Sequence, residues 1–188
     1  MNIVVKTNSG KIVVRPDTTW ERDSEDVFLP EFVSRVSWTP VLFARICKPG
    51  RSVAKEFAAR YYDGINYGIL LYPEDLFDGS EDGLACASCL DHSSFLSTPL
   101  YDKLTLDRSS NKFIVKKSDE VIYSFNKGTS EMIESAIEQA TRYCYIRTGD
   151  LLAIELEGRR PLCRREDGET GISGFFCDNC ITNFKIIF

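Results

Sequence analysis

Hydrophobic and polar residues alternate most regularly in the second half of the chain. Two short runs in which apolar residues alternate with others, Phe113–Lys116 and Val121–Phe125, flank the step Ser118-Asp119. Asp at a turn can bond its own backbone while the flanking runs pair with each other. The pattern therefore predicts a β-hairpin.

A helix and a strand are expected directly after this hairpin. Ser130 is the expected N-cap, and glutamates in the first turn suit the helix dipole. Arg142 and Arg147 are expected at the far end, with Gly149 as the stop. Leu151–Leu156 is an apolar run short enough for a buried strand. The helix of about four turns is predicted by apolar residues at helical spacing: Met132, Ile133, Ala136, Ile137 and Ala140.

The rest of the chain contains further short apolar runs bounded by turn residues, which predict strands. They are Ile3–Val5, Ile12–Val14, Val41–Ile46, Tyr62–Tyr72, Leu84–Leu90, Ile172–Cys177 and Ile181–Phe188. Leu84–Leu90 is expected to be buried on both faces. Ser52–Tyr62 is expected to be helical, whereas Pro16–Pro40 is expected to form a loop or lid with a short helix or turn. Phe95–Ser110 is expected to be loop. Many short strands with one clear helix predict a β-rich α+β fold in a single domain, residues 1–188.

Composition narrows the class of protein. The chain is 43% hydrophobic and 27% charged, as in a soluble globular protein. A net charge of -5 without a basic run argues against nucleic-acid binding. We see neither a signal peptide nor a membrane span, so we expect a cytoplasmic protein. The 7 cysteines, an odd number, fit reduced thiols better than a disulfide framework.

The predicted hairpin–helix–strand unit also carries a family resemblance. The order Ser124-Phe125-Asn126-x-x-Thr129-Ser130-Glu131-Met132-Ile133, then a helix, then Thr148-Gly149-Asp150-Leu151-Leu152, resembles the C-terminal half of the fumarylacetoacetate hydrolase superfamily. The resemblance extends over residues 41–156 and is specific over 119–156. It implies the mixed β-sandwich or β-roll of that superfamily, which usually forms homodimers.

The resemblance also implies a chemistry. Members act on acylpyruvates, oxaloacetate and related 2-oxo or β-dicarbonyl acids. They usually hold Mg²⁺, Mn²⁺ or Ca²⁺ with a Glu-x-Glu on one strand and an Asp ending a later strand. Residues i and i+2 of a strand share a face, and hard cations prefer clustered carboxylates. The metal then polarises the paired oxygens of the substrate.

This chain departs from the family pattern where the metal should bind. Asp91 stands at the position of the family Asp. The best match to Glu-x-Glu is Asn66-Tyr67-Gly68, so both carboxylates are missing. The arginine that commonly follows the Asp is replaced by Ser93-Ser94. Lys103 is the candidate for the family lysine that faces the substrate carboxylate. The candidate pocket residues are therefore Asn66, Asp91 and Lys103, and we expect no bound metal or cofactor.

The only histidine, His92, is expected to be a hydrogen-bonded structural residue. As a strand neighbour of Asp91 it would point to the opposite face. Since no histidine lies upstream, the His–Glu pair that activates water in the hydrolytic members has no counterpart. A tyrosine group is expected to serve core and edge packing rather than ligand stacking: Tyr61, Tyr62, Tyr67 and Tyr72.

The second candidate site consists of two Cys-x-x-Cys pairs, Cys86/Cys89 and Cys177/Cys180. Four thiolates could close a tetrahedral zinc site. However, the first pair lies in a predicted strand, where residues i and i+3 face opposite sides. The second pair resembles a turn between the last two strands. We therefore expect buried thiols, with a zinc site or a redox pair as alternatives.

Several functional hypotheses remain open from the sequence. The first is a fumarylacetoacetate-hydrolase-like protein with a degenerate site, either catalytically silent or of altered activity. The second is an active metal-dependent hydrolase or decarboxylase of a small 2-oxo acid, with a metal site rebuilt from Asp63, Asp91 and Glu74 or Asp75. The third is a structural or partner-binding homodimer. A zinc-stabilised module is the fourth.

Overall fold

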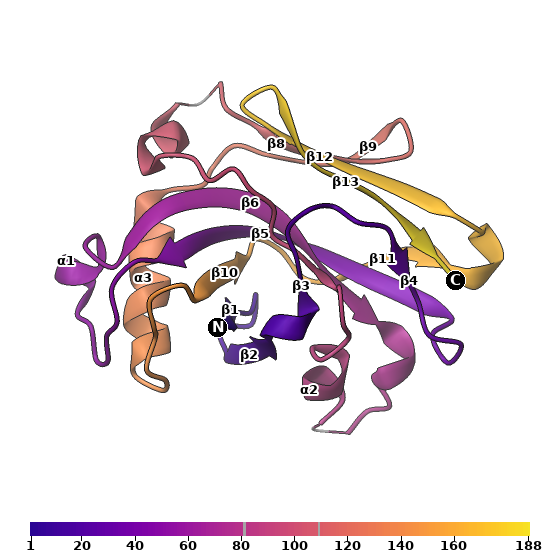
Figure 1. The fold of residues 1–188 in the computed structure, drawn as a ribbon, viewed down its shortest axis with the longest axis horizontal. Helices are drawn as coiled ribbons and strands as arrows, with labels where there is room; N and C mark the ends of the chain where they lie inside the picture. Colours follow the sequence, from indigo (N-terminus) through magenta and orange to yellow (C-terminus); the bar gives the residue numbers. More distant parts are fainter. Residues whose placement is uncertain (81, 109) are drawn as a thin grey trace.

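The computed structural model describes residues 1–80, 82–108 and 110–188 and shows two β-sheets packed face to face (Figure 1). The strands are β1 (Asn2–Lys6), β2 (Ile12–Pro16), β3 (Trp20–Glu21), β4 (Val27–Phe28), β5 (Arg35–Ile46), β6 (Tyr62–Pro73), β7 (Ser94–Phe95), β8 (Phe113–Lys117), β9 (Glu120–Phe125), β10 (Leu151–Glu155), β11 (Arg160–Arg164), β12 (Thr170–Phe176) and β13 (Asn179–Ile187). The helices are α1 (Lys55–Ala58), α2 (Gly83–Ala87) and α3 (Ser130–Thr141). The short 3₁₀ helices are η1 (Asp17–Thr19), η2 (Glu74–Leu76), η3 (Lys103–Asp107) and η4 (Arg165–Asp167).

The larger sheet is built around two long antiparallel strands, β5 and β6. Its strand order is β2-β1-β10-β5-β6-β7-β3, and β11 pairs with β5. Strand β1 runs parallel to β10 and antiparallel to β2. The register of the central pair places Val41 opposite Gly68 and Phe43 opposite Asn66. This central pair is the part of the fold in which the resemblance places the metal ligands.

The smaller sheet has the order β4-β13-β12-β8-β9 and covers one face of β5 and β6 (Figure 1). Its hairpin β8–β9 is the one predicted from the sequence, and Ser118 in the turn has a φ of 55°. The last two strands are also confirmed. Cys177 and Asp178 occupy the left-handed region in the turn between them, a conformation that Asp tolerates.

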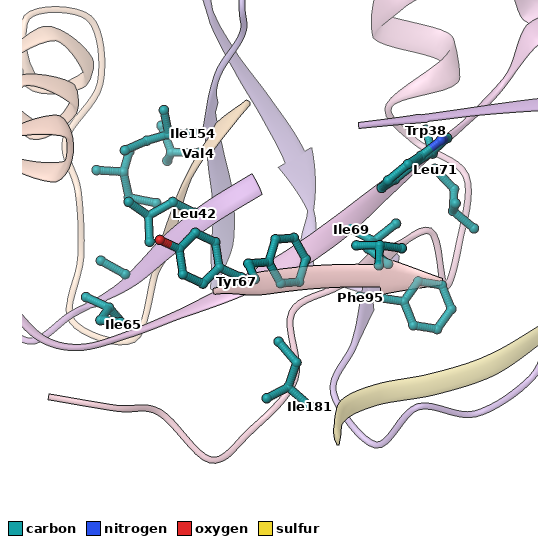
Figure 2. Packing of buried hydrophobic residues seen from close by; sticks show 14 of the residues in the cluster. Val4, Trp38, Leu42, Ile65, Tyr67, Ile69, Leu71, Phe95, Ile154 and Ile181 are labelled. Atoms are coloured by element: carbon teal, nitrogen blue, oxygen red, sulfur yellow. The ribbon is translucent and has the colours of Figure 1, made fainter. Parts of the chain in front are cut away.

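The main core lies between the two sheets and is rich in aromatic side chains. The rings of Tyr67 and Phe113 stack with centroids 4.8 Å apart, and the Phe95 ring stacks on that of Phe184. Figure 2 shows Tyr67, Ile69 and Phe95 within this cluster. The tyrosines at 62, 67 and 72 are buried, so the prediction that they serve packing is confirmed.

Helix α3 lies against β10 and β1 and buries the apolar face predicted from its sequence. Its N-cap is Thr129, one residue before the predicted Ser130, because the Thr129 hydroxyl accepts the Met132 N–H. The helix ends at Thr141 with Arg142 as its C-cap, so the expected place of Arg142 at the helix end is confirmed, whereas Arg147 and Gly149 lie beyond the helix and their predicted roles at its end were wrong. After the helix, Ile146 pairs with Gly50 in a β-bridge.

Three other sequence predictions were wrong. Leu84–Leu90 contains a helix, α2, instead of a strand, which suits a run with alanines and no β-branched residue. The stretch Pro16–Pro40 contains β3, β4 and the start of β5, and Pro40 lies inside β5 with its carbonyl accepting the Leu156 N–H. Only Lys55–Ala58 of the predicted helix at 52–62 forms, because the preceding backbone is bonded to the end of α3.

The α+β, β-rich fold class with one main helix is confirmed. The stretch Phe95–Ser110, expected to be loop, contains the end of β7 and η3. Among the residues that the structure describes, no helix is long and apolar enough to cross a membrane.

Candidate functional site

The residue that the resemblance places at the metal site, Asn66, is fully buried in β6. Its side-chain amide donates to the carbonyl oxygens of Ser97 (3.2 Å) and Pro99 (3.0 Å). Its Oδ1 accepts the N–H of Tyr67 at 2.8 Å. Both amide protons and the carbonyl oxygen are therefore engaged by the protein itself, and the side chain serves the fold.

The segment after β7 covers this face of β6 closely. Ile65 and Tyr101 exchange backbone hydrogen bonds of 2.9 and 2.8 Å, which hold the segment against the strand. Gly68 sits against the carbonyl oxygen of Phe95, where a Cβ would collide with backbone. Gly64, on the same face, would place a Cβ 2.9 Å from the Cβ of Leu100. Because a strand alternates its faces, positions 64, 66 and 68 all lie under this cover.

The other two candidate residues lie away from Asn66. Asp91 follows α2 in a turn and lines a separate cavity that Asn66 does not line. Lys103 begins η3, and its ammonium nitrogen lies 5.5 Å from the centre of the Tyr62 ring. None of the hydrogen bonds of Asn66 involves Asp91 or Lys103. The structure thus distributes the three predicted pocket residues over three places.

The alternative metal set is also engaged elsewhere. Asp63 forms a two-pronged ion pair with Arg45, with both N–O distances at 2.9 Å. Asp75 accepts hydrogen bonds from the backbone and hydroxyl of Ser34 and from the backbone of Arg35. Burial opposes ionisation of Asp75, but these bonds outweigh it and lower its pKa. Among the described residues, no group of three or more His, Cys, Asp or Glu side chains is placed to hold a metal ion.

His92 is hydrogen-bonded, as the sequence predicted, but its partner was not anticipated. Its Nδ1 lies 2.9 Å from Oε2 of Glu21, a residue only 5% exposed. Burial raises the pKa of the Glu21 carboxyl, but hydrogen bonds from His92 and from the N–H groups of Asp23 and Glu25 lower it overall. Because an ionised carboxylate can only accept, Nδ1 carries a proton toward Glu21, and Nε2 is the ring nitrogen left free.

The expected separation of Asp91 and His92 was wrong. The prediction placed them on a strand, with side chains on opposite faces. They lie in a turn, where His92 has a φ of 53°, and both side chains line one cavity. This cavity measures about 580 Å³. It is lined by Glu25, Asp26, Val27, Phe28, Pro30, Phe32, Leu76, Cys86, Cys89, Leu90, Asp91 and His92.

A buried arginine fixes the turn that carries these residues. Arg15 is fully buried, and its guanidinium donates to the carbonyls of Ser88 and Leu71 and to the Ser93 hydroxyl. Burial lowers the pKa of Arg15, which the Tyr72 hydroxyl and the Glu155 carboxylate partly oppose. Arg15 lies in strand β2 and gave no sequence signal, since its partners come from distant segments.

The four cysteines of the two Cys-x-x-Cys pairs are not buried thiols, contrary to the prediction. Cys86, Cys89 and Cys180 are exposed, and Cys177 is intermediate. The first pair lies on and just after α2, because the predicted strand is a helix there. The second pair flanks the β12–β13 turn, as predicted.

Comparison with known proteins identifies the type of fold. No family model and no curated protein matches the sequence. Among solved structures, a protein of the fumarylacetoacetate hydrolase family from Yersinia pestis CO92 superposes with a TM-score of 0.79 at 16% identity, covering 99% of this chain and 92% of that one. A fumarylpyruvate hydrolase from Pseudomonas aeruginosa, in complex with Mn²⁺ and pyruvate, gives 0.80 at 13% identity, covering 100% and 90%.

A third similar structure is the maleylpyruvate hydrolase from Sphingobium sp. SYK-6, with a TM-score of 0.74 and 16% identity over 99% of this chain and 69% of that one. The chain therefore has the fold of the fumarylacetoacetate hydrolase type. The fold that the resemblance implied is confirmed, and the low identities establish the fold alone.

Proposed function

We propose that this chain is a fumarylacetoacetate-hydrolase-like protein that has lost the metal and acid–base site of that fold. It is catalytically silent toward acylpyruvates and oxaloacetate. The observation that carries the proposal is Asn66: the side chain that should face a metal is fully buried and bonded to Ser97 and Pro99.

The residues present do not fit a divalent cation at this position. Mg²⁺ and Mn²⁺ prefer several oxygen ligands, usually including carboxylates. This face of β6 offers one neutral amide oxygen, already bonded to a backbone N–H, and a glycine without room for a side chain. Asp91 lies on a separate cavity. We therefore assign no catalytic step to a metal in this chain.

A thermal unfolding series with Mg²⁺, Mn²⁺ and Ca²⁺ at millimolar concentration tests the proposal. A site saturated at about 100 times its dissociation constant adds roughly 2.7 kcal/mol of stability. For a domain of this size the melting temperature would rise by about 5–10 °C. We expect none of these ions to raise the melting temperature specifically. The wild type and Asp91→Asn should respond to the ions in the same way.

Activity assays complete the test. We expect no cleavage of fumarylpyruvate and no decarboxylation of oxaloacetate above the rate with metal alone. The Pseudomonas aeruginosa fumarylpyruvate hydrolase, crystallised with Mn²⁺ and pyruvate, serves as the positive control. A metal-dependent shift that Asp91→Asn abolishes, together with turnover, would show that the chain is an active enzyme.

A further inference from the structure

The cavity beside His92 has apolar walls and lies apart from the covered face of β6. It is bounded by the segment around β4, by η2, and by α2 with the turn after it. Two aromatic side chains at the cavity, Phe28 and Phe32, are 74% and 57% exposed. A volume of about 580 Å³ falls in the range of small-molecule sites.

Carboxylates dominate the charge at this cavity. Glu25, Asp26 and Asp91 line it, and the described lining residues include no lysine or arginine. The Asp26 carboxylate accepts the backbone N–H of Lys185 and also attracts the Lys185 ammonium group, so its negative charge is partly compensated. No ion pair among the described residues engages Glu25 or Asp91. Such a site repels the 2-oxo acids of the family and attracts cations.

The exposed rings of Phe28 and Phe32 add to the attraction for a cation. The face of an aromatic ring carries partial negative charge and attracts cations. The Glu21 carboxylate meanwhile holds the His92 imidazole by Nδ1, which fixes the orientation of a ring that lines the cavity. Carboxylates and aromatic walls thus favour the same kind of ligand.

We propose that this cavity binds a small organic ammonium ion with an apolar body, in which the ammonium group meets Glu25 and Asp91 and the body lies against Phe28, Phe32 and Leu76. This binding function is independent of the lost metal site. It gives the chain a ligand of the opposite charge to the substrates of the proteins whose fold it shares.

Three probes that share an indole ring and a two-carbon linker test the proposal by calorimetry or ligand-observed NMR: tryptamine (cationic), tryptophol (neutral) and indole-3-propionate (anionic). A fragment of this size should bind with a Kd of about 0.1–1 mM. We expect tryptamine to bind saturably, tryptophol to bind at least about fivefold more weakly, and indole-3-propionate not to bind.

Two variants locate the binding. Cys86→Trp should abolish it, because the exposed Cys86 lines the cavity and a large side chain there fills it without disturbing the core. Glu25→Gln with Asp91→Asn should weaken tryptamine binding by about twofold to fivefold for each carboxylate removed. The matched control, Asp119→Asn with Glu120→Gln, removes two exposed carboxylates from the β8–β9 turn, at the opposite edge of the smaller sheet from β4, and should change nothing. The proposal fails if indole-3-propionate binds as well as tryptamine, or if Cys86→Trp leaves tryptamine binding intact.

Discussion

The side-chain amide of Asn66 donates a hydrogen bond of 3.0 Å to the carbonyl oxygen of Pro99. A second bond, to the carbonyl of Ser97, holds the segment after β7 over the middle of β6. At the position where the resemblance places a metal ligand, the Asn66 side chain is thus a clamp between two parts of the chain. An amide is suited to this role, because a carboxylate cannot donate to two carbonyl oxygens.

Asn66→Asp should therefore destabilise the protein and create no metal affinity. At pH 7 a buried carboxylate facing two carbonyls should cost about 3–5 kcal/mol of unfolding free energy. Such a carboxyl has a pKa raised above its unfolded value of about 3.9, so the loss is smallest below that pH and grows as the pH rises. Urea unfolding at pH 4 and pH 7 measures it, with the exposed Asn126→Asp as control. A variant that is stable at pH 7 and gains Mn²⁺ binding would contradict the clamp.

Gly68→Ala should also destabilise the protein, because the Phe95 carbonyl occupies the space that the new Cβ needs. Overpacking of this kind costs about 1–3 kcal/mol. Gly171→Ala in β12 is the matched control, since a methyl group at that position would have nothing within 4 Å and the φ there is not positive. Urea unfolding should therefore give a lower free energy of unfolding for Gly68→Ala than for Gly171→Ala. Equal stabilities would mean that the covering segment moves aside easily.

Glu21→Gln should make the free energy of unfolding less dependent on pH in the acidic range. The lowered pKa of Glu21 means that its ionised form is favoured in the folded state. Its contribution is present above the unfolded pKa and is lost as the pH falls through the folded pKa. The wild type should therefore lose more stability than Glu21→Gln between about pH 5 and pH 3. Chemical unfolding across this range measures the difference, and parallel profiles would rule out a role for the Glu21–His92 pair.

The Cys-x-x-Cys thiols should hold no structural zinc. Cys86 and Cys89 belong to the α2 region, whereas Cys177 and Cys180 flank the β12–β13 turn. Elemental analysis of protein purified without chelator should find well under one zinc per chain. Stoichiometric zinc whose removal unfolds the protein would show that the four thiolates meet after all.

Thiol reactivity should follow burial. Burial raises the pKa of Cys163 to about 11, and this side chain is 4% exposed. Since the thiolate is the nucleophile, Cys163 should resist iodoacetamide at pH 8, while the exposed Cys86, Cys89 and Cys180 react. Peptide mass spectrometry at timed intervals gives the order. Rapid labelling of Cys163 in folded protein would indicate that β11 opens readily.

Local signals in the sequence determined the elements whose stability is itself local. The hairpin at Ser118, helix α3 and strand β10 formed as predicted, because turn chemistry, helical spacing and a short buried run all act over a few residues. Where local signals were weak, as in the alanine- and cysteine-containing run at 84–90, periodicity could not separate a helix from a strand, and the prediction failed.

The resemblance places Asn66 and Gly68 where the family has two carboxylates, but only the tertiary structure decided what these two residues do. Whether an amide binds a ligand or clamps the chain depends on the segment that packs over it, whose bonded carbonyls lie 31 and 33 residues further on. The hydrogen bond between Glu21 and His92, which are separated by 71 residues, also depends on the tertiary structure. Such contacts form only when the sheets assemble, because hydrogen bonds between distant segments have no counterpart in local sequence patterns.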